Sequence, residues 1–426
     1  MRGRLSRFGR DKPWPNLRHR SREGFCPAKA HDRLKGHCVM KNSILIRNIL
    51  FAGLLLQSIV CCFESRGAAG DVDLSFNGGS GVNGPIQAVA VQPDGKAIIG
   101  GWFTTVQGHM RNGVARLNPD GTGDATFHST AAGTWPASSV ALQADGRVLV
   151  GGTRVVRLHA DGSWDNSFTN ILDEQIGEYG PIVYAIAVQP DGKVLIGGYF
   201  SYVHGVLHPN IARLNADGSL DGSFTPPASV IEAHTLVLQP DGKVLVAGVF
   251  DHQGIHRQTL VRLSSNGSLD NSFSPIEVPV YSLALQPDGK IVVAGSAYNG
   301  THNDFVLARF TSAGILDTSF GASGWATIDY AATHDTATAL AIQSDGGVLV
   351  GGYATNGTHD DFAVARLMPD GALDTAFGDS GKALVDFAGG DDRISTLAIQ
   401  SNSTVVAAGY ALTSTGEDFA LVAFTL

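Results

Sequence analysis

The sequence predicts an all-β fold, for three reasons that are visible along its 426 residues. The twelve letters QPDGKVLIGGYF at 189–200 recur with small changes along most of the chain, so the chain is a tandem repeat. Within each repeat, short apolar runs alternate with glycine-containing turns, which is typical of strands and hairpins. No segment has a convincing helical period of apolar residues.

The first half of each repeat contains two predicted strands joined by a tight turn. The first strand is an alternating run such as AIAVQ, and the second is a nearly continuous apolar run such as KVLIGG, which suits a strand buried on both faces. In six repeats the turn contains Asp-Gly, where glycine takes the positive φ that a tight hairpin needs. Seven glutamines end the first strands, at intervals of 46 to 57 residues: Gln92, Gln143, Gln189, Gln239, Gln286, Gln343 and Gln400.

The second half contains a third strand such as IARLN, a turn such as ADG, and a fourth strand that opens with Asp-x-Ser/Thr/Ala-Phe. A unit of about 50 residues with four short strands is typical of a β-propeller blade and not of a helical solenoid. The fourth-strand motif also occurs seven times, starting at Asp73, Asp124, Asp165, Asp221, Asp270, Asp317 and Asp374.

The two sets of seven are out of phase along the chain. The repeats begin with DVDLSF, a fourth strand, and they stop at DFALVAFTL, a third strand. The simplest solution is a ring in which residues from Val72 onward supply the outer strand of the last blade, because closure removes exposed sheet edges. We therefore predict a closed, seven-bladed β-propeller over residues 71–426.

Six arginines precede six of these aspartates by eight residues, and folding about the intervening turn places each arginine opposite its aspartate. A contact repeated around a ring marks what every blade needs to fold, so we interpret the pairs as structural. The last blade departs from the pattern, since Ala423 stands where its arginine is expected. The pairs are Arg116–Asp124, Arg157–Asp165, Arg213–Asp221, Arg262–Asp270, Arg309–Asp317 and Arg366–Asp374.

The first 70 residues differ from the rest in charge, with 14 of the 30 lysine and arginine residues and 4 of the 39 acidic residues. Met40 opens a basic segment, followed by an apolar run and small residues up to Ala69, which is the layout of a secretory signal peptide. We predict an untranslated or disordered basic leader at 1–39, a signal peptide at 40–69, and a secreted, periplasmic or cell-surface protein without a stable transmembrane span. An uncleaved anchor and a lipid on Cys61 are the alternatives.

The tandem LxxDGSLDxSF and QPDGKVLVGG units resemble the delta-60 repeat, a bacterial propeller-type repeat of exported and surface proteins. The resemblance covers about residues 71–426, and both halves of the unit recur in order. It implies the propeller fold and export, and it supplies no catalytic residues. Two units depart from the pattern: the second has almost no loop after Gly152, and the seventh has Ser401-Asn402-Ser403 where Pro-Asp-Gly is expected.

Motifs that carry known chemistry are largely missing, and no catalytic residue is assigned. The sequence contains no HExxH, GxSxG, phosphate loop or cysteine cluster. After residue 70 the chain holds 16 basic and 35 acidic residues, and most of the basic ones belong to the repeats, which argues against a nucleic-acid partner. The spacing of Asn215, Asp217 and Asp221 lacks the layout of an EF-hand, and a hairpin turn explains it.

Candidate binding residues collect in the loops between second and third strands, where the units differ most. In the last three units these loops read NGTHNDF, NGTHDDF and TSTGEDF, with aspartates at matching positions. In a ring of blades, aspartates at matching positions form an arc on one face. This arc could bind a divalent cation such as Ca²⁺ or the hydroxyls of a sugar, or each aspartate could simply cap its own loop. The candidates are Asp304, Asp361, Asp418, His302, His359, Tyr298, Tyr353, Tyr410, His204 and His252.

Two functions from different classes remain open at this point. The favoured one is a non-catalytic, monomeric binding module that holds an extracellular glycan, peptide or envelope protein on this loop-bearing face. The alternative is a propeller hydrolase or lyase with a divalent cation in the central funnel. An enzyme should gather acids and histidines from several blades into one coordination shell at the axis, whereas a binding face should spread them outward. Polar loops that merely face water would serve neither function.

Overall fold

The computed structural model describes residues 68–73, 75–76, 82–129, 136–168, 172, 180–277, 279–330, 334–387, 389–400, 404–413 and 416–426. They belong to one compact unit. The predicted leader and the predicted signal peptide, apart from its last two residues, lie outside the described residues. Within these ranges all regular elements are strands, and no helix long and apolar enough to cross a membrane occurs.

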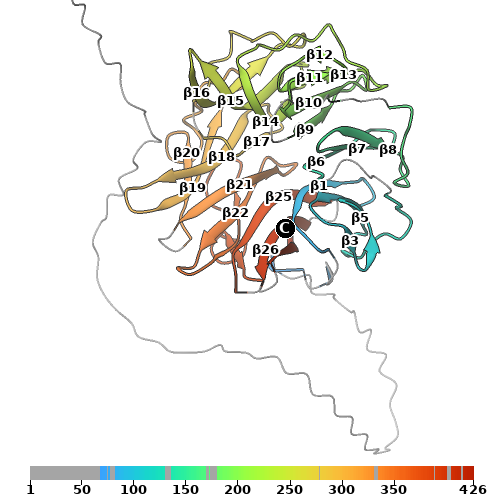
Figure 1. Cartoon of the computed structure of the whole chain (residues 1–426). Coiled ribbons are helices and arrows are strands. Elements are labelled where there is room, and N and C mark those ends of the chain that lie inside the picture. The colour runs from blue at the N-terminus through green and yellow to red at the C-terminus, as the bar shows by residue number, and fades with distance from the viewer. Residues whose placement is uncertain are drawn as a thin grey trace, which may run out of the picture. The chain divides into compact units, whose positions relative to one another are not determined.

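Seven antiparallel sheets of three or four strands follow one another along the chain (Figure 1). The prediction of an all-β chain is confirmed. The first four sheets contain β1 (Ile86–Val91), β2 (Ala97–Gly101) and β5 (Val114–Leu117); β6 (Ser139–Leu142), β7 (Val148–Gly151) and β8 (Val155–Leu158); β9 (Ile182–Val188), β10 (Val194–Tyr199) and β13 (Ile211–Leu214); and β14 (Val230–Leu238), β15 (Val244–His252) and β16 (Ile255–Leu263).

The last three sheets have longer strands, and two of them are four-stranded. They contain β17 (Ser282–Leu285), β18 (Ile291–Tyr298), β19 (Asn303–Phe310) and β20 (Trp325–Ile328); β21 (Asp335–Ile342), β22 (Val348–Thr355), β23 (Asp360–Leu367) and β24 (Lys382–Val385); and β25 (Asp392–Gln400), β26 (Thr404–Thr413) and β27 (Gly416–Thr425). Two small hairpins extend the first and third sheets: β3 (Thr105–Val106) with β4 (His109–Met110), and β11 (Tyr202–Val203) with β12 (Val206–Leu207).

The second strand of each sheet is buried on both faces, which explains its continuous apolar sequence. In β10, all residues from Val194 to Gly198 are buried. The strand ends in glycines because the first strand bulges there, as shown by the register shift at Gly197 and Gly198. A Cβ atom on Gly198 would lie 2.0 Å from the carbonyl oxygen of Ile182, so only glycine fits this close approach of the two backbones.

The predicted fourth strand differs from the structure in one respect. The segment LDGSF at 220–224 makes a single bridge, between Leu214 and Leu220, and then turns. The cause is the side chain of Asp221, whose carboxylate accepts hydrogen bonds from the N–H and hydroxyl groups of Ser223, because such a local turn competes with strand pairing. Among the described residues, only β20 and β24 form an extended fourth strand.

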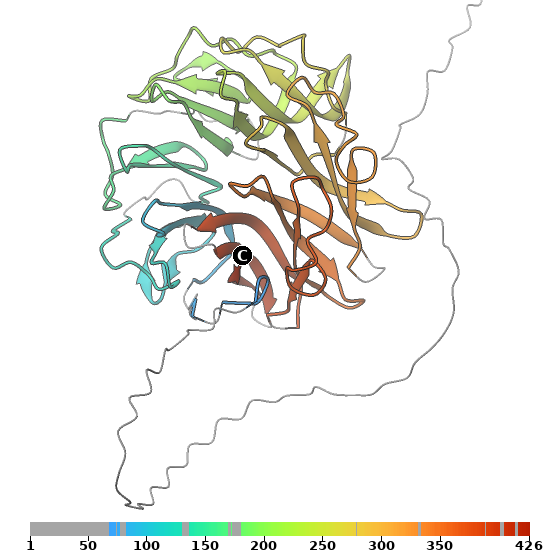
Figure 2. The ribbon, with the colours of Figure 1, turned by 180° about the vertical axis from the view of Figure 1, so that it is seen from behind.

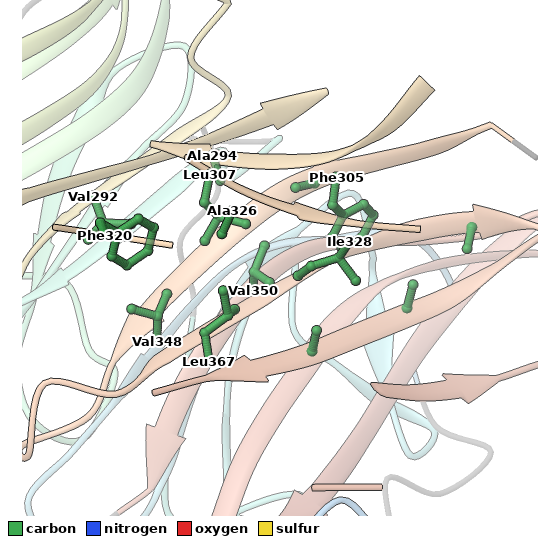
Figure 3. Close-up of a cluster of buried hydrophobic side chains, with 14 residues drawn as sticks. Val292, Ala294, Phe305, Leu307, Phe320, Ala326, Ile328, Val348, Val350 and Leu367 are labelled. Atoms are coloured by element: carbon green, nitrogen blue, oxygen red, sulfur yellow. The ribbon is translucent and has the colours of Figure 1, made fainter. Parts of the chain in front are cut away.

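The hydrophobic core lies between neighbouring sheets. Figure 3 shows one such layer, in which Phe305 and Phe320 of the β17–β20 unit pack with Val350 and Leu367 of the next sheet. Both phenylalanines are fully buried. In six of the seven Asp-x-Ser/Thr/Ala-Phe motifs the Phe is buried, so the motif joins turn formation to core packing.

Neighbouring sheets touch through their first strands. β1, β6, β9, β14, β17, β21 and β25 contact one another in this order, and β25 also contacts β1. Figure 2 shows the last sheet, in red, beside the first strands, in blue. The N-terminal segment pairs with the last strand: the N–H of Asp73 donates to Ala423 O (2.8 Å), and the N–H of Thr425 donates to Asp71 O (3.0 Å).

Candidate functional site

The two ends of the strands form two different surfaces. We call the end with the Asp-Gly turns, which join first to second and third to fourth strands, the turn face. We call the other end, with the second-to-third loops and the connections from each sheet to the next, the loop face. The turn face repeats the same contacts from sheet to sheet, and the loop face carries the candidate binding residues.

On the turn face, each of the six arginines contacts the aspartate that follows it by eight residues. The Nε–Oδ2 distances lie between 2.7 and 2.9 Å. In five sheets the basic residue after the first turn reaches the same carboxylate, as Lys193 does at 2.8 Å from Asp221. In the sixth, Gly347 occupies this position. We did not predict this second ion pair from the sequence. The fixed position of the basic residue directly after Asp-Gly was the signal that could have indicated it.

The same arginine also binds the next sheet. The Arg213 Nη1 donates to the carbonyl oxygen of Ser265 (2.5 Å), which lies in the turn of the following unit. Its guanidinium stacks over the ring of Phe224, 4.9 Å from the centroid. Equivalent bonds cross to the next unit from Arg116, Arg157, Arg262 and Arg309. We call this set, the Arg with its Asp, its Phe and the next unit's carbonyl, the arginine junction.

The carboxylates of these junctions are held ionised. Burial acts to raise the pKa of Asp165, but hydrogen bonds from Ser167 and the Arg157 guanidinium outweigh it and lower that pKa to about 2. At Asp221, burial also acts to raise the pKa, but hydrogen bonds from Lys193, Ser223 and Arg213 hold it well below its usual range. The pairs are therefore charged at neutral pH, and their repeated geometry serves packing between sheets.

On the loop face, Asp304 and Asp361 are the second residues of β19 and β23, and both are buried. Each accepts a hydrogen bond from an asparagine of its own loop: Asn299 to Asp304 (3.0 Å) and Asn356 to Asp361 (3.0 Å). Burial raises the pKa of both carboxyls. Loop capping thus occupies part of each carboxylate, as the capping alternative expects.

Other acids from the neighbouring elements join these two aspartates. Asp361 groups with Asp386, which follows β24, and Asp392, which begins β25; one carboxylate oxygen of each lies within 4.8 Å of the others. We call these three the second carboxylate cluster. In the preceding unit, Asp304 groups in the same way with Asp329 and His302. We call His302, Asp304 and Asp329, together with Asp335, the first carboxylate cluster. Asp335 stands outside that 4.8 Å grouping, and it is included because it begins β21 as Asp392 begins β25.

The two clusters are repeats of one arrangement. Each residue of the second stands 57 positions after its equivalent in the first. The N–H of Tyr330 donates to Asp335 Oδ2 (2.9 Å), and the N–H of Phe387 donates to Asp392 Oδ2 (2.7 Å). The aspartates in the loops were predicted as candidates, and Asp329, Asp335, Asp386 and Asp392 were not. The repeated spacing was the signal that could have found them.

The buried acids of these clusters resist ionisation. Asp335 and Asp392 are both fully buried. Burial raises the pKa of Asp335 to about 7; the Tyr330 N–H opposes this rise, and the charges of Asp329 and Asp304 add to it. Burial likewise raises the pKa of Asp392 to about 6, against the Phe387 N–H and with the charges of nearby acids. These clusters are the groups of described residues that could hold a metal ion.

The remaining candidates have separate surroundings. Asp418 accepts a hydrogen bond from the N–H of Phe419 (2.9 Å) and so caps its own strand. The sheet that follows Asp418 in the succession of contacts begins with β1. Alignment of Ile86–Gly101 with Ala337–Gly352 makes Gly84 the equivalent of Asp335 there, and glycine offers no carboxylate.

The candidate tyrosines and histidines also differ from one another. The Arg393 guanidinium lies over the ring of Tyr353, with its Cζ 4.5 Å from the ring centroid. Tyr410 is the cross-strand neighbour of Arg393. Tyr298 is exposed and donates to Gly300 O (2.9 Å). His359 lies in the loop of the second carboxylate cluster, where its backbone N–H donates to Asn356 Oδ1 (3.0 Å). The ring of His204 lies 3.2 Å from Gly218 O, and that of His252 lies 3.3 Å from Thr259 Oγ1.

Three hairpin tips project from the loop face of the first, third and fourth sheets. Their turns are Gln107-Gly108, His204-Gly205 and Gln253-Gly254, in which both residues have positive φ. One or two residues after each glycine, an aliphatic side chain is exposed: Met110 (72%), Leu207 (63%) and Ile255 (57%). Of the residues in these turns, only His204 was predicted as a candidate, and the exposed apolar side chains were not. The recurring [Gln/His]-Gly inside the second-to-third loop was the signal.

The repeats and sheets define the chain as a β-propeller repeat protein. Six of its repeats match a family described as "Domain of unknown function (DUF5122) beta-propeller", over residues 92–127, 143–168, 189–224, 239–273, 286–320 and 343–377. Each match runs from a first-strand glutamine to the Phe of an Asp-x-Ser/Thr/Ala-Phe motif. The match supports a β-propeller repeat family, and the finer assignment to the delta-60 repeat stays a prediction. No curated protein matches the sequence.

Solved structures of similar fold include the following two. One is the extracellular domain of a hybrid two-component system from B. thetaiotaomicron, with 11% identity and a TM-score of 0.50; the match covers 84% of this chain and 43% of that one. This chain therefore spans less than half of that relative. Another is YCF48 bound to D1 peptide, with 12% identity, a TM-score of 0.50, and coverage of 81% and 94%. At these identities the likeness concerns the fold alone.

The arginine junction gives a direct test. Replacing Arg213 by alanine leaves the buried carboxylate of Asp221 with Lys193 and Ser223 alone, so we expect the free energy of unfolding to fall by about 3 kcal/mol. Arg257→Ala is the matched control, because its ion pair with Glu277 is exposed and should contribute under about 1 kcal/mol. Chemical denaturation of Arg213→Ala, Asp221→Ala and the double variant measures the coupling. Strictly additive losses would contradict a direct interaction.

Proposed function

We propose that this protein is an exported, seven-bladed β-propeller that binds a partner on its loop face and is not an enzyme. The partner class that the loop face suits best is a peptide or protein of the cell envelope or its surroundings, with a glycan as the other candidate. The observation that carries this proposal is the set of exposed aliphatic residues on the three hairpin tips.

The hairpin tips have the features of a recognition surface. Glycines 108, 205 and 254 have open space where a Cβ atom would stand, so the tips project away from the body of the sheets. Apolar side chains that are held out on rigid turns expose surface that would be buried more favourably against a partner. Trp102, Tyr199 and Tyr202, which are also exposed, lie in the same loops. Aliphatic side chains suit a peptide or protein surface better than they suit a sugar.

In a closed ring of seven blades, the second-to-third loops would all lie on one face of the protein. The succession of contacts from β1 through β25 and back to β1 supports it, as does the pairing of Asp71 and Asp73 with the last strand. A peptide partner is also consistent with the structure of similar fold in which YCF48 is bound to D1 peptide.

The hydrolase or lyase alternative receives less support. It expects acids and histidines from several sheets in one shell at the axis. The two carboxylate clusters instead join the third and fourth strands of one sheet to the first strand of the next. This placement is that of a junction between two blades and favours the binding module.

The hairpin tips can be tested with a matched control on the turn face. We expect Met110→Ser with Leu207→Ser and Ile255→Ser to weaken binding to peptide arrays and isolated envelope fragments by at least about tenfold, because three apolar contacts are lost. The control triple, Leu269→Ser, Ile315→Ser and Met368→Ser, alters exposed apolar residues of the third-to-fourth turns and should bind as the parent does. Equal binding by both triples would contradict the proposal, and binding to glycan arrays alone would overturn the choice of a peptide or protein partner.

Export predicts a mature chain that starts near Gly70 outside the cytoplasm. A mature chain that keeps Ala69 retains the hydrogen bond that the N–H of Gly378 donates to Ala69 O (2.7 Å). N-terminal sequencing of the native protein, after separation of the cytoplasm from the envelope and medium, measures this. Recovery of residues 1–39 in the native protein would contradict it.

A further inference from the structure

We propose that the first and second carboxylate clusters are two equivalent binding sites for a divalent cation, with calcium as the ion they suit. Each ion would join the third and fourth strands of one sheet to the first strand of the next. The sites would lie at the junctions between the β17–β20, β21–β24 and β25–β27 sheets.

The spacing of the second carboxylate cluster fits a single ion. Carboxylate oxygens from Asp361, Asp386 and Asp392 lie within 4.8 Å of one another. Calcium holds its oxygen ligands at about 2.3 to 2.6 Å, so two ligands on opposite sides of the ion lie about 4.6 to 5.2 Å apart. The three oxygens can therefore face one calcium ion without a large rearrangement.

An unpaired buried oxygen points to a missing positive charge. Asp392 is fully buried, its Oδ2 accepts the Phe387 N–H, and its Oδ1 has no hydrogen-bond partner. Asp335 repeats this in every respect: full burial, one bond from the Tyr330 N–H, and an unpartnered Oδ1. An ionised carboxylate buried without a partner is unfavourable unless a cation compensates it. The same unpartnered buried oxygen at two equivalent positions indicates that the two clusters have the same role.

The nearest basic side chains have other partners. Arg393 Nη2 lies 2.6 Å from Asp360 Oδ2, and its guanidinium stacks on Tyr353. Lys382 donates to the backbone oxygen of Asp329 (2.9 Å) and lies over the Tyr330 ring. Neither contact involves the unpartnered oxygens of Asp335 or Asp392. Neither Arg393 nor Lys382 therefore compensates these two oxygens, which have no hydrogen-bond partner among the described residues.

The chemistry of the ligands favours calcium over softer metals. The second carboxylate cluster offers only oxygen ligands, which suit hard cations. His302 adds a nitrogen to the first cluster, where its Nε2 lies 3.1 Å from Asp304 Oδ1, so zinc is the competitor to test there. With three carboxylates each, the sites should bind calcium in the range of extracellular modules, about 10⁻⁴ to 10⁻³ M.

Titration calorimetry of the full chain with CaCl₂ tests the proposal. We expect two calcium ions per chain in the parent, one in Asp392→Asn, one in Asp335→Asn and none in the double variant. Asp288→Asn is the control, because this exposed turn-face aspartate lies outside the clusters, and it should bind two ions. No binding of calcium by the parent up to about 10 mM, a stoichiometry unchanged by the variants, or binding of zinc without calcium would each overturn the proposal.

Thermal unfolding separates ligand loss from misfolding. Calcium at about ten times its dissociation constant should raise the melting temperature of the parent by about 2 °C per site, and EGTA should reverse the rise. Without calcium, the double variant should melt at or above the temperature of the parent, because a neutral amide is easier to bury than a carboxylate. A double variant that melts far below the parent without calcium would show the clusters to be structural polar contacts and would overturn the proposal.

Discussion

The arginine junction is the interaction on which the rest of the structure depends. One guanidinium binds the aspartate of its own unit, stacks on the buried phenylalanine, and donates to the backbone of the next unit. A single side chain thus fixes the turn, the core layer and the distance between neighbouring sheets. Its charge is matched locally and its donors are used, so the contact can be repeated from sheet to sheet without accumulating unpaired charge.

This constraint separates stability from recognition. The polar contacts that repeat from sheet to sheet lie on the turn face, where the sequence repeats. The loop face is therefore free to differ between units: small hairpins with exposed aliphatic side chains in three of the first four sheets, and buried acids in the last three. Loops on a rigid scaffold commonly carry function for this reason. The two halves of the loop face thus offer two kinds of surface, one apolar and one acidic.

Much of this architecture could be predicted from the sequence, because hairpin turns and strand alternation are local signals. The spacing of eight residues between Arg213 and Asp221 sufficed to pair them. The carboxylate clusters could not be found in the same way, since Asp361 meets Asp386 and Asp392 only through sheet-to-sheet packing. The LDGSF segment was assigned to a strand because it follows the third strand and a hairpin turn, whereas the Asp221 side chain turns the backbone after one bridge. Side-chain to backbone bonds of this kind are invisible to a periodicity argument.

The last sheet is where the repeated contact fails, because Ala423 replaces the arginine, and the N-terminal segment takes over through the bonds of Asp71 and Asp73. Closure of the ring by the two termini is the central claim. The most direct measurement is thermal unfolding of a chain that begins at Asn77 against one that begins at Ala68. The shorter chain should lose at least several degrees in melting temperature and should aggregate through the exposed edge of β27. Equal melting temperatures for the two chains would contradict closure by the N-terminal strand.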